Sequence, residues 1–280
     1  MKNHTYLRFP EFKRKAVTLS YDDGVIFDEK LIDVFNRYGL KATFNLNSGL
    51  FYPAGDKTRL TESQAVALYK DSGHEIAVHG AKHLSLTEVP IETACKDVLE
   101  DRNALEKLFG KIVRGMAYAY GVYSDKVVAM LENCGIKYAR TIMPTERFDI
   151  PEDWLRMPVT CHHNNPRLMF LVDEFLDCPE KNFFLENTPR LFFLWGHSYE
   201  FNDDNNWDVI ERFAKKIGGR DDVWYATNGE IFDYVQAYDR LEYSVENNMV
   251  NNSSAKDVYI NFYGKDIKVP AGKEILIKNN

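Results

Sequence analysis

The sequence predicts an α/β fold in which a closed parallel barrel is followed by a small antiparallel β appendage. Strand-like apolar runs and helix-like amphipathic runs alternate about seven or eight times between residues 16 and 240. After residue 240 the hydrophobic period drops to two, which is typical of antiparallel strands. Regular βα units of this length favour a closed TIM-like barrel over an open doubly wound sheet.

The expected strands are short apolar runs that recur along the chain. They span residues 16–21, 41–47, 74–79, 112–119, 136–141, 155–160, 190–197 and 223–226. The expected helices lie between and after them, at residues 27–39, 60–73, 91–109, 125–134, 167–177, 207–217 and 229–240. Thr61 and Gln64 have the spacing of a capping box at the start of the second helix. We expect a barrel domain over residues 1–240 and a β-rich extension over residues 241–280 packed on it.

The composition is that of an ordinary globular protein and excludes two classes of partner. Among the 280 residues, 45% are apolar and 28% are charged, and the net charge is -7. Charges of both signs are interspersed, so a nucleic-acid-binding surface is not expected. Nowhere do about 18 apolar residues follow one another without a charge, so no membrane span is expected. The first residues lack the apolar centre of a signal peptide, which favours a cytoplasmic location.

The four cysteines are widely spread and form no CxxC pair. They are Cys95, Cys134, Cys161 and Cys178. This spacing argues against a zinc ribbon and against a disulfide framework. We therefore expect reduced thiols.

Polar side chains fall at the ends of several expected strands. Asp22 and Asp23 end the first strand, His79 ends the third, and His197 ends the strand "RLFFLWGH". The C-terminal ends of parallel barrel strands meet on one rim, where barrel enzymes build their sites. His83 follows His79 by four residues, a spacing that lets two imidazoles bind one ion. A carboxylate with two imidazoles is a common hydrolytic metal set, so this rim is expected to bind a divalent metal.

Three motifs on this βα background resemble those of a known family. "TLSYDDG", "HGAKH" and "LWGH", in this order and spacing, are similar to the motifs of the polysaccharide deacetylase family, also called the NodB homology domain or carbohydrate esterase family 4. The resemblance covers roughly residues 14–240. It implies a distorted (β/α)7 barrel that removes acetyl groups from N- or O-acetylated sugars with the help of a divalent metal.

The resemblance also implies a role for each motif residue. Asp23, His79 and His83 would hold the metal ion. Asp22 would be the general base that takes a proton from the attacking water, and His197 would be the general acid for the leaving group. One aspartate of the adjacent pair would thus bind the cation while its neighbour accepts the proton.

Four further residues are expected to contact the substrate or the developing oxyanion. By family precedent the backbone N–H of Tyr120 would bind the oxyanion. His162 and His163 follow a short strand whose end faces the same rim, so they are expected to contact the substrate or the residues around it. Glu200 lies in the polar stretch "GHSYEFNDDNNW", which we expect to be a loop, and could pair with His197 or with a substrate hydroxyl.

One segment departs from the family pattern. The family carries an arginine and a proline in the motif after the fourth strand, where this chain has "MAYAYG", with Ala117 and Ala119 at those positions. Arg114 lies three residues before Ala117 and could replace the missing arginine. Because the metal ligands and the acid–base pair are intact, we expect a divergent but active member.

The expected activity is metal-dependent removal of acetyl groups from an N- or O-acetylated carbohydrate. Zinc is the first expectation for the metal, with cobalt, nickel or iron as alternatives. A cytoplasmic location would favour a soluble sugar or a small acylated substrate over a cell-wall polymer. Two other functions stay open, namely hydrolysis of a non-peptide C–N bond in a small amide and an inactive carbohydrate-binding role.

Overall fold

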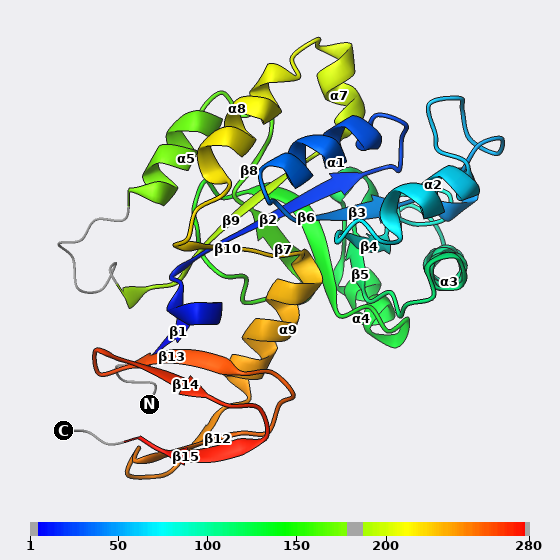
Figure 1. The fold of residues 1–280 in the computed structure, drawn as a ribbon. Coiled ribbons are helices and arrows are strands. Elements are labelled where there is room, and N and C mark those ends of the chain that lie inside the picture. Colours follow the sequence, from blue (N-terminus) through cyan, green and yellow to red (C-terminus); the bar gives the residue numbers. More distant parts are fainter. Residues whose placement is uncertain (1–4, 178–186, 278–280) are drawn as a thin grey trace.

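The computed structural model describes residues 5–177 and 187–277, so Cys178 lies outside the described residues. A parallel sheet forms the centre of the molecule and helices cover its outer face, as Figure 1 shows. None of the helices within these ranges is both long and apolar enough to cross a membrane. The predicted α/β architecture is confirmed.

The strands of the barrel occur close to the predicted positions. They are β2 (Lys15–Asp22), β3 (Ala42–Leu46), β4 (Glu75–Val78), β5 (Gly115–Ala117), β6 (Tyr138–Pro144), β7 (Met157–Val159), β8 (Cys161–His162), β9 (Arg190–Gly196) and β10 (Val223–Tyr225). All eight residues of β2 are buried, because a strand covered on both faces has no side open to solvent. The sheet order is β7-β6-β5-β4-β3-β2-β9-β8, with β10 paired to the first residues of β2.

This order closes the sheet, because its two end strands are consecutive in the chain. Only Thr160 separates β7, which pairs with β6, from β8, which pairs with β9. The backbone N–H of Thr160 itself donates to the carbonyl of Phe193 on β9 at 2.8 Å. The single stretch from Met157 to His162 therefore joins both edges, and the distorted barrel expected from the family resemblance is present.

The helices on the outer face also match the sequence pattern. They are α1 (Asp28–Arg37), α2 (Glu62–Tyr69), α3 (Ile91–Phe109), α4 (Asp125–Asn133), α5 (Leu168–Leu176), α7 (Ser198–Asp203), α8 (Asp208–Ile217) and α9 (Asn228–Asp239). The predicted capping box of α2 is present, with Gln64 N–H donating to Thr61 Oγ1 at 3.2 Å and Thr61 N–H donating to Gln64 Oε1 at 2.9 Å.

The expectation of a loop after His197 is wrong. Residues 198–203 form the short helix α7, capped by the Glu200 carboxylate, which accepts from the backbone N–H of His197 at 3.1 Å. Phe201 anchors the helix in the core with no exposed surface. A helix this short carries too few apolar residues to show a helical period in the sequence.

The residues after 240 form two small antiparallel sheets, as predicted. Their strands are β11 (Glu242–Tyr243), β12 (Met249–Asn252), β13 (Val258–Phe262), β14 (Lys265–Val269) and β15 (Lys273–Leu276). Tyr263 and Gly264 connect β13 to β14 with φ values of 49° and 83°, the left-handed conformation that a tight two-residue hairpin requires. The N-terminal strand β1 (Thr5–Arg8) joins this appendage by pairing with β13 (Figure 1).

The appendage is held to the last helix by a buried tyrosine. Tyr234 of α9 donates its hydroxyl hydrogen to the carbonyl of Arg8 at 2.6 Å and accepts from the backbone N–H of Tyr259 at 3.0 Å. Ala237 of the same helix packs in the apolar cluster of the two sheets. The division into domains at residue 240 stays a prediction.

A buried carboxyl group links three helices on the side of the barrel where α1 begins. Asp28, at the start of α1, accepts hydrogen bonds from Tyr69 of α2 and Ser198 of α7 and has no exposed surface. Burial raises the pKa of Asp28 from 3.8 to about 7, despite the two hydroxyl donors, which oppose the rise. The folded protein therefore binds a proton here that the unfolded chain releases near pH 4.

Replacing Asp28 by Asn is expected to remove a pH dependence of stability. In the unsubstituted protein this group stabilises the fold below pH 4, and the contribution falls as the pH rises to about 7. The stability of Asp28→Asn relative to the parent should therefore rise by roughly 2–3 kcal/mol between pH 5 and pH 8. Urea unfolding at both pH values measures this difference. Glu29→Gln, at the exposed neighbouring acid, is the control, and parallel behaviour of the two variants would contradict the assignment.

Candidate active site and metal centre

The adjacent aspartates lie where β2 ends and the chain turns sharply. Asp22 is the last residue of β2 and is 2% exposed, while Asp23 is 8% exposed. Asp23 has a φ of 87° and Gly24 a φ of 65°. Positive φ values are uncommon for residues other than glycine and recur at functional sites. This turn directs the two carboxylates toward different neighbours.

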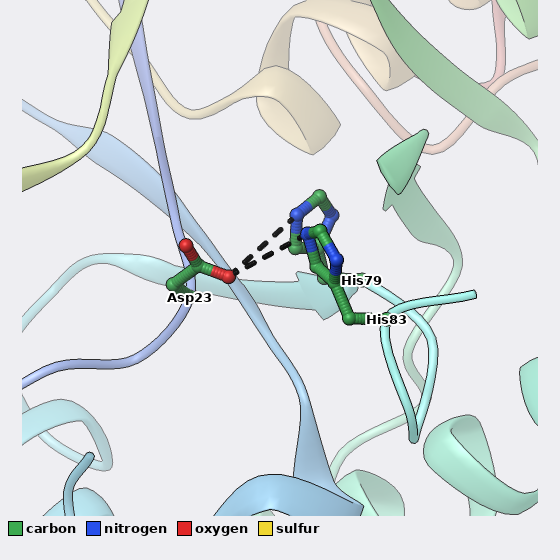
Figure 2. A group of neighbouring side chains, drawn as sticks. All are labelled: Asp23, His79 and His83. Carbon is green, nitrogen blue, oxygen red and sulfur yellow. Dashed lines mark ion pairs between the residues drawn. The ribbon is translucent and has the colours of Figure 1, made fainter. Parts of the chain in front are cut away.

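Asp23 faces two imidazoles, as predicted. Its Oδ1 lies 4.0 Å from Nε2 of His79 and 3.7 Å from Nε2 of His83, and Figure 2 shows the three side chains converging. His79 follows β4, and its Nδ1 lies 2.9 Å from the carbonyl oxygen of Ala117. That contact requires the ring proton on Nδ1, which leaves the Nε2 lone pair free toward the other two side chains. The donor types, their spacing and the tautomer all fit a divalent metal ion.

The loop that carries both histidines is shaped by two acids of α3. Asp101 Oδ2 accepts from the backbone N–H of His79 at 3.0 Å, and Asp97 Oδ1 accepts from that of Lys82 at 2.9 Å. Gly80, with a φ of 83°, lies so close to Asp97 that a Cβ would be 2.6 Å from Oδ2. Sequence reasoning missed these acids. The available signal was two carboxylates four residues apart on the apolar face of a helix.

A buried arginine holds Asp22. Arg140 of β6 has no exposed surface, and its Nη2 donates to Asp22 Oδ2 while its Nε donates to Ser20 Oγ at 3.1 Å. The guanidinium also lies over the Trp195 ring at 4.6 Å from the ring centre. On the other side, Asn45 Nδ2 donates to Asp22 Oδ1 at 2.8 Å. Asp22 is thereby fixed at both oxygen atoms.

The charges around Asp22 keep it ionised. Burial alone would raise the pKa of this carboxyl, but the Arg140 guanidinium, assisted by His79 and His197, outweighs burial and lowers the pKa below its ordinary value. Nε2 of His79 lies 3.8 Å from Asp22 Oδ2, and Nε2 of His197 lies 3.9 Å from it. The expected base is therefore available as a carboxylate.

Arg114 does not replace the missing motif arginine. Its guanidinium forms two 3.0 Å hydrogen bonds to the carboxylate of Asp233 on α9, because it precedes β5 at the end of the barrel opposite the rim. Arg140 takes the place instead. It lies directly opposite Ala117 in the pairing of β5 with β6, so the guanidinium reaches the site from the neighbouring strand.

His197 lies between the base and a second carboxylate. Its Nδ1 is 3.3 Å from Oε2 of Glu200, which supports the expected pairing of these two residues. Burial of the imidazole disfavours protonation, but Glu200 and Asp22 outweigh that effect and raise the pKa of His197 above its ordinary value. The protonated form that a general acid requires is thus favoured.

Glu200 also brings His162 and His163 to the rim. Its Oε2 lies 3.1 Å from Nε2 of each ring, and these imidazoles lower the pKa of Glu200 far below its ordinary range although burial acts in the opposite direction. His163 has no exposed surface and stacks on Phe201 at 4.0 Å between ring centres. Burial lowers the pKa of His163 to about 4.

These two histidines and the glutamate are close enough to hold an ion, but the tautomer of His162 does not suit a metal ligand at Nε2. Nδ1 of His162 accepts from the backbone N–H of Asn164 at 3.1 Å, which puts the ring proton of the neutral form on Nε2. Nε2 then carries the proton and lies 3.1 Å from Oε2 of Glu200, whereas a metal ligand needs a free lone pair on that nitrogen. We therefore assign the cluster to the support of His197 and keep its substrate contacts as a prediction.

Two more side chains complete the rim. Tyr120 has a φ of 59°, is 63% exposed, and places its ring 4.7 Å from that of His83. Its role in binding an oxyanion stays a prediction. Arg59, which sequence reasoning missed, places Nη1 3.2 Å from Asp23 Oδ1 and 3.0 Å from Asn47 Oδ1. Asn47 in turn donates to the carbonyls of His79 and Gly80 at 3.0 and 2.8 Å.

Comparison with known proteins gives a family match over part of the chain. Residues 10–139 match the family described as Polysaccharide deacetylase. A search of curated proteins gave no match.

Solved structures share the fold at low sequence identity. A protein of Mycobacterium smegmatis assigned as a polysaccharide deacetylase is 17% identical, with a TM-score of 0.60 over 84% of this chain and 94% of that one. Peptidoglycan deacetylase PdaC from Bacillus subtilis is 16% identical, with a TM-score of 0.50 over 81% of this chain and 95% of that one. For the Streptococcus pyogenes deacetylase PplD the match spans 45% of this chain and 55% of that one, at 22% identity and a TM-score of 0.42.

The matched residues contain the two motifs that supply Asp22, Asp23, His79 and His83. The shared fold extends over 84% of the chain. Motif order, family match and barrel architecture agree. The family match over residues 10–139 and the shared barrel both support the predicted resemblance to polysaccharide deacetylases.

Proposed function

We propose that this protein is a metal-dependent deacetylase acting on an N- or O-acetylated carbohydrate. The observation that carries the proposal is that two adjacent carboxylates on one rim have different surroundings. Asp23 faces the Nε2 atoms of two histidines, whereas Asp22 is held by Arg140 and Asn45. One carboxylate is thus arranged as a ligand and its neighbour as a base.

Asp23, His79 and His83 would hold the ion, which when bound supplies Lewis acidity to the acyl carbonyl and the attacking water. Asp22, kept ionised by Arg140, accepts the proton of the water. His197, whose protonated form is favoured by Glu200 and Asp22, donates a proton to the departing amine or alcohol. The backbone N–H of Tyr120 would bind the oxyanion.

Arg140 bears on the two alternative functions, the inactive carbohydrate-binding role and the hydrolysis of a small amide. The inactive binding role rested on the loss of the motif arginine, and Arg140 supplies a guanidinium to the same carboxylate from the neighbouring strand. Hydrolysis of a small non-sugar amide uses the same residues and remains the second candidate. Zinc as the ion and a cytoplasmic location are kept as predictions.

The experiment that tests the proposal is acetate release from a panel of N- and O-acetylated mono- and oligosaccharides and small amides. The purified protein would be assayed as isolated, after chelation, and after addition of zinc, cobalt, nickel or iron. We expect release from at least one sugar, loss with the chelator and recovery with a metal. Release from small amides alone would favour the second candidate, and no release from a metal-loaded protein would contradict the proposal.

Replacing His79 by Ala is expected to weaken metal binding by more than about a hundredfold and to abolish acetate release, because one of three protein ligands is lost. Isothermal titration calorimetry with zinc or cobalt measures the affinity for the metal. His162→Ala is the matched control, since it removes a rim histidine that lies outside the set of Asp23, His79 and His83. Equal metal affinity of the two variants would contradict the assigned ligand set.

A further inference from the structure

Two cysteines that are far apart in sequence meet between α3 and α4. Cys95 lies in the second turn of α3, and Cys134 is the residue that ends α4. Their Sγ atoms are 3.5 Å apart, and both are free thiols. Cys161, the other cysteine in the described ranges, is buried in β8 and is not part of this contact. Cys95 and Cys134 therefore form a close pair of thiols although they are 39 residues apart in the sequence.

One of the two thiols is accessible and the other is not. Cys95 is half-buried and lines a surface cavity of about 820 Å³ between the two helices, together with Leu99 and Met130. Leu99 is 44% exposed at the cavity. Cys134 is only 2% exposed, and burial raises the pKa of its thiol to about 12. A reagent that enters the cavity therefore meets Cys95 first.

We propose that Cys95 and Cys134 form a redox modification site, at which a small-molecule disulfide such as oxidised glutathione converts the two thiols into an internal disulfide. The Cys95 thiolate attacks one sulfur of the reagent, forming a mixed disulfide and releasing one reduced thiol. Cys134 then loses its proton to solvent and displaces the second reduced thiol from Cys95. In sum, two protein thiols are oxidised and one reagent disulfide is reduced to two thiols.

The site lies close to the scaffold of the candidate metal loop. Asp97 follows Cys95 by two residues on α3, and Asp101 follows one turn later; these acids hold the backbone of Lys82 and His79. A disulfide between Cys95 and Cys134 would link the second turn of α3 covalently to the end of α4. The inference does not depend on the proposed deacetylase activity, and its test does not use that activity.

The experiment is incubation of the reduced full-length protein with oxidised glutathione at pH 7 and pH 9, followed by acid quenching, alkylation and mass spectrometry of intact protein and peptides. We expect the mass of two hydrogens to be lost and a cross-linked peptide pair containing Cys95 and Cys134. Formation should be faster at pH 9, because Cys134 must lose its proton. A reducing agent should restore both thiols.

Two serine variants make the test decisive. Cys134→Ser should stop at the first step and keep one glutathione on Cys95, whereas Cys95→Ser should take up no glutathione at Cys134. An unchanged mass of the parent protein would overturn the proposal. A stable glutathione adduct on Cys95 of the parent, equal to that of Cys134→Ser, would overturn it as well.

Discussion

Asp22→Asn is expected to lower the rate of acetate release by about 10²–10⁴-fold while the affinity for one divalent ion changes only a few-fold. The amide keeps the shape of the carboxylate but cannot accept the proton of the attacking water, and general base catalysis is typically worth about 10²–10⁴-fold. Asp23, His79 and His83 are unchanged, so the ion should still bind. Steady-state kinetics and metal titration of the same preparation measure both quantities.

Asp23→Asn is the matched control for Asp22→Asn. It changes the neighbouring residue in the same way, but it removes a charged ligand from the metal set. We expect it to lose affinity for the ion together with activity. If Asp22→Asn retained full activity, Asp22 would not be the base. If both variants lost affinity for the ion equally, the assignment of Asp23 as the ligand and Asp22 as the base would be wrong.

The second large effect is expected at Arg140. Arg140→Met should lower the free energy of unfolding by roughly 3–5 kcal/mol, because it leaves the carboxylate of Asp22 buried without its cation. Acetate release should also fall by about a hundredfold or more, since Asp22 loses the group that fixes Oδ2. Urea unfolding and steady-state kinetics measure the two effects.

Arg114→Met is the matched control for Arg140→Met. Arg114 also pairs with a carboxylate, but both partners are partly exposed, and such pairs contribute about 0–1 kcal/mol. This variant should keep nearly full stability and activity. A double variant, Arg140→Met with Asp22→Asn, should recover part of the stability lost in Arg140→Met, because no unpaired charge is then buried. Equal losses of stability and activity in the two variants would show that Arg140 does not support Asp22 in the proposed way.

Much of the fold could be predicted because its signals are local. Helices α1 and α3 show an amphipathic period, α2 carries a capping box, and β2 and β9 stand out as apolar runs; Asp22, Asp23, His79 and His197 lie at or next to strand ends. Strand β8 and helix α7 were missed because two and six residues are too few to show a period. β1 was not foreseen in the appendage, because its partner β13 lies at the other end of the chain.

The missed parts of the site are set by contacts between distant segments. Arg140 occupies the place expected for an arginine at Ala117 only because β5 and β6 pair in one particular register. Asp97 and Asp101 act on backbone N–H groups of a distant loop, so their spacing on the apolar face of α3 did not reveal which residues they hold. The contact of Cys95 with Cys134 likewise depends on the packing of α3 against α4. A single sequence therefore predicts where strands end, but it does not predict which residues of other strands and helices lie next to them.

The closure of the barrel through one short stretch has a consequence for how the chain tolerates insertions. The side chains of Cys161 and His162 in β8 differ in exposure, at 0% and 24%, because successive residues of a strand face opposite sides. A slip of one residue against β9 would exchange these two environments. Adding or deleting a single residue between β7 and β8 is therefore a change to the rim itself, whereas the same change in a loop at the opposite end of the barrel alters only a connection.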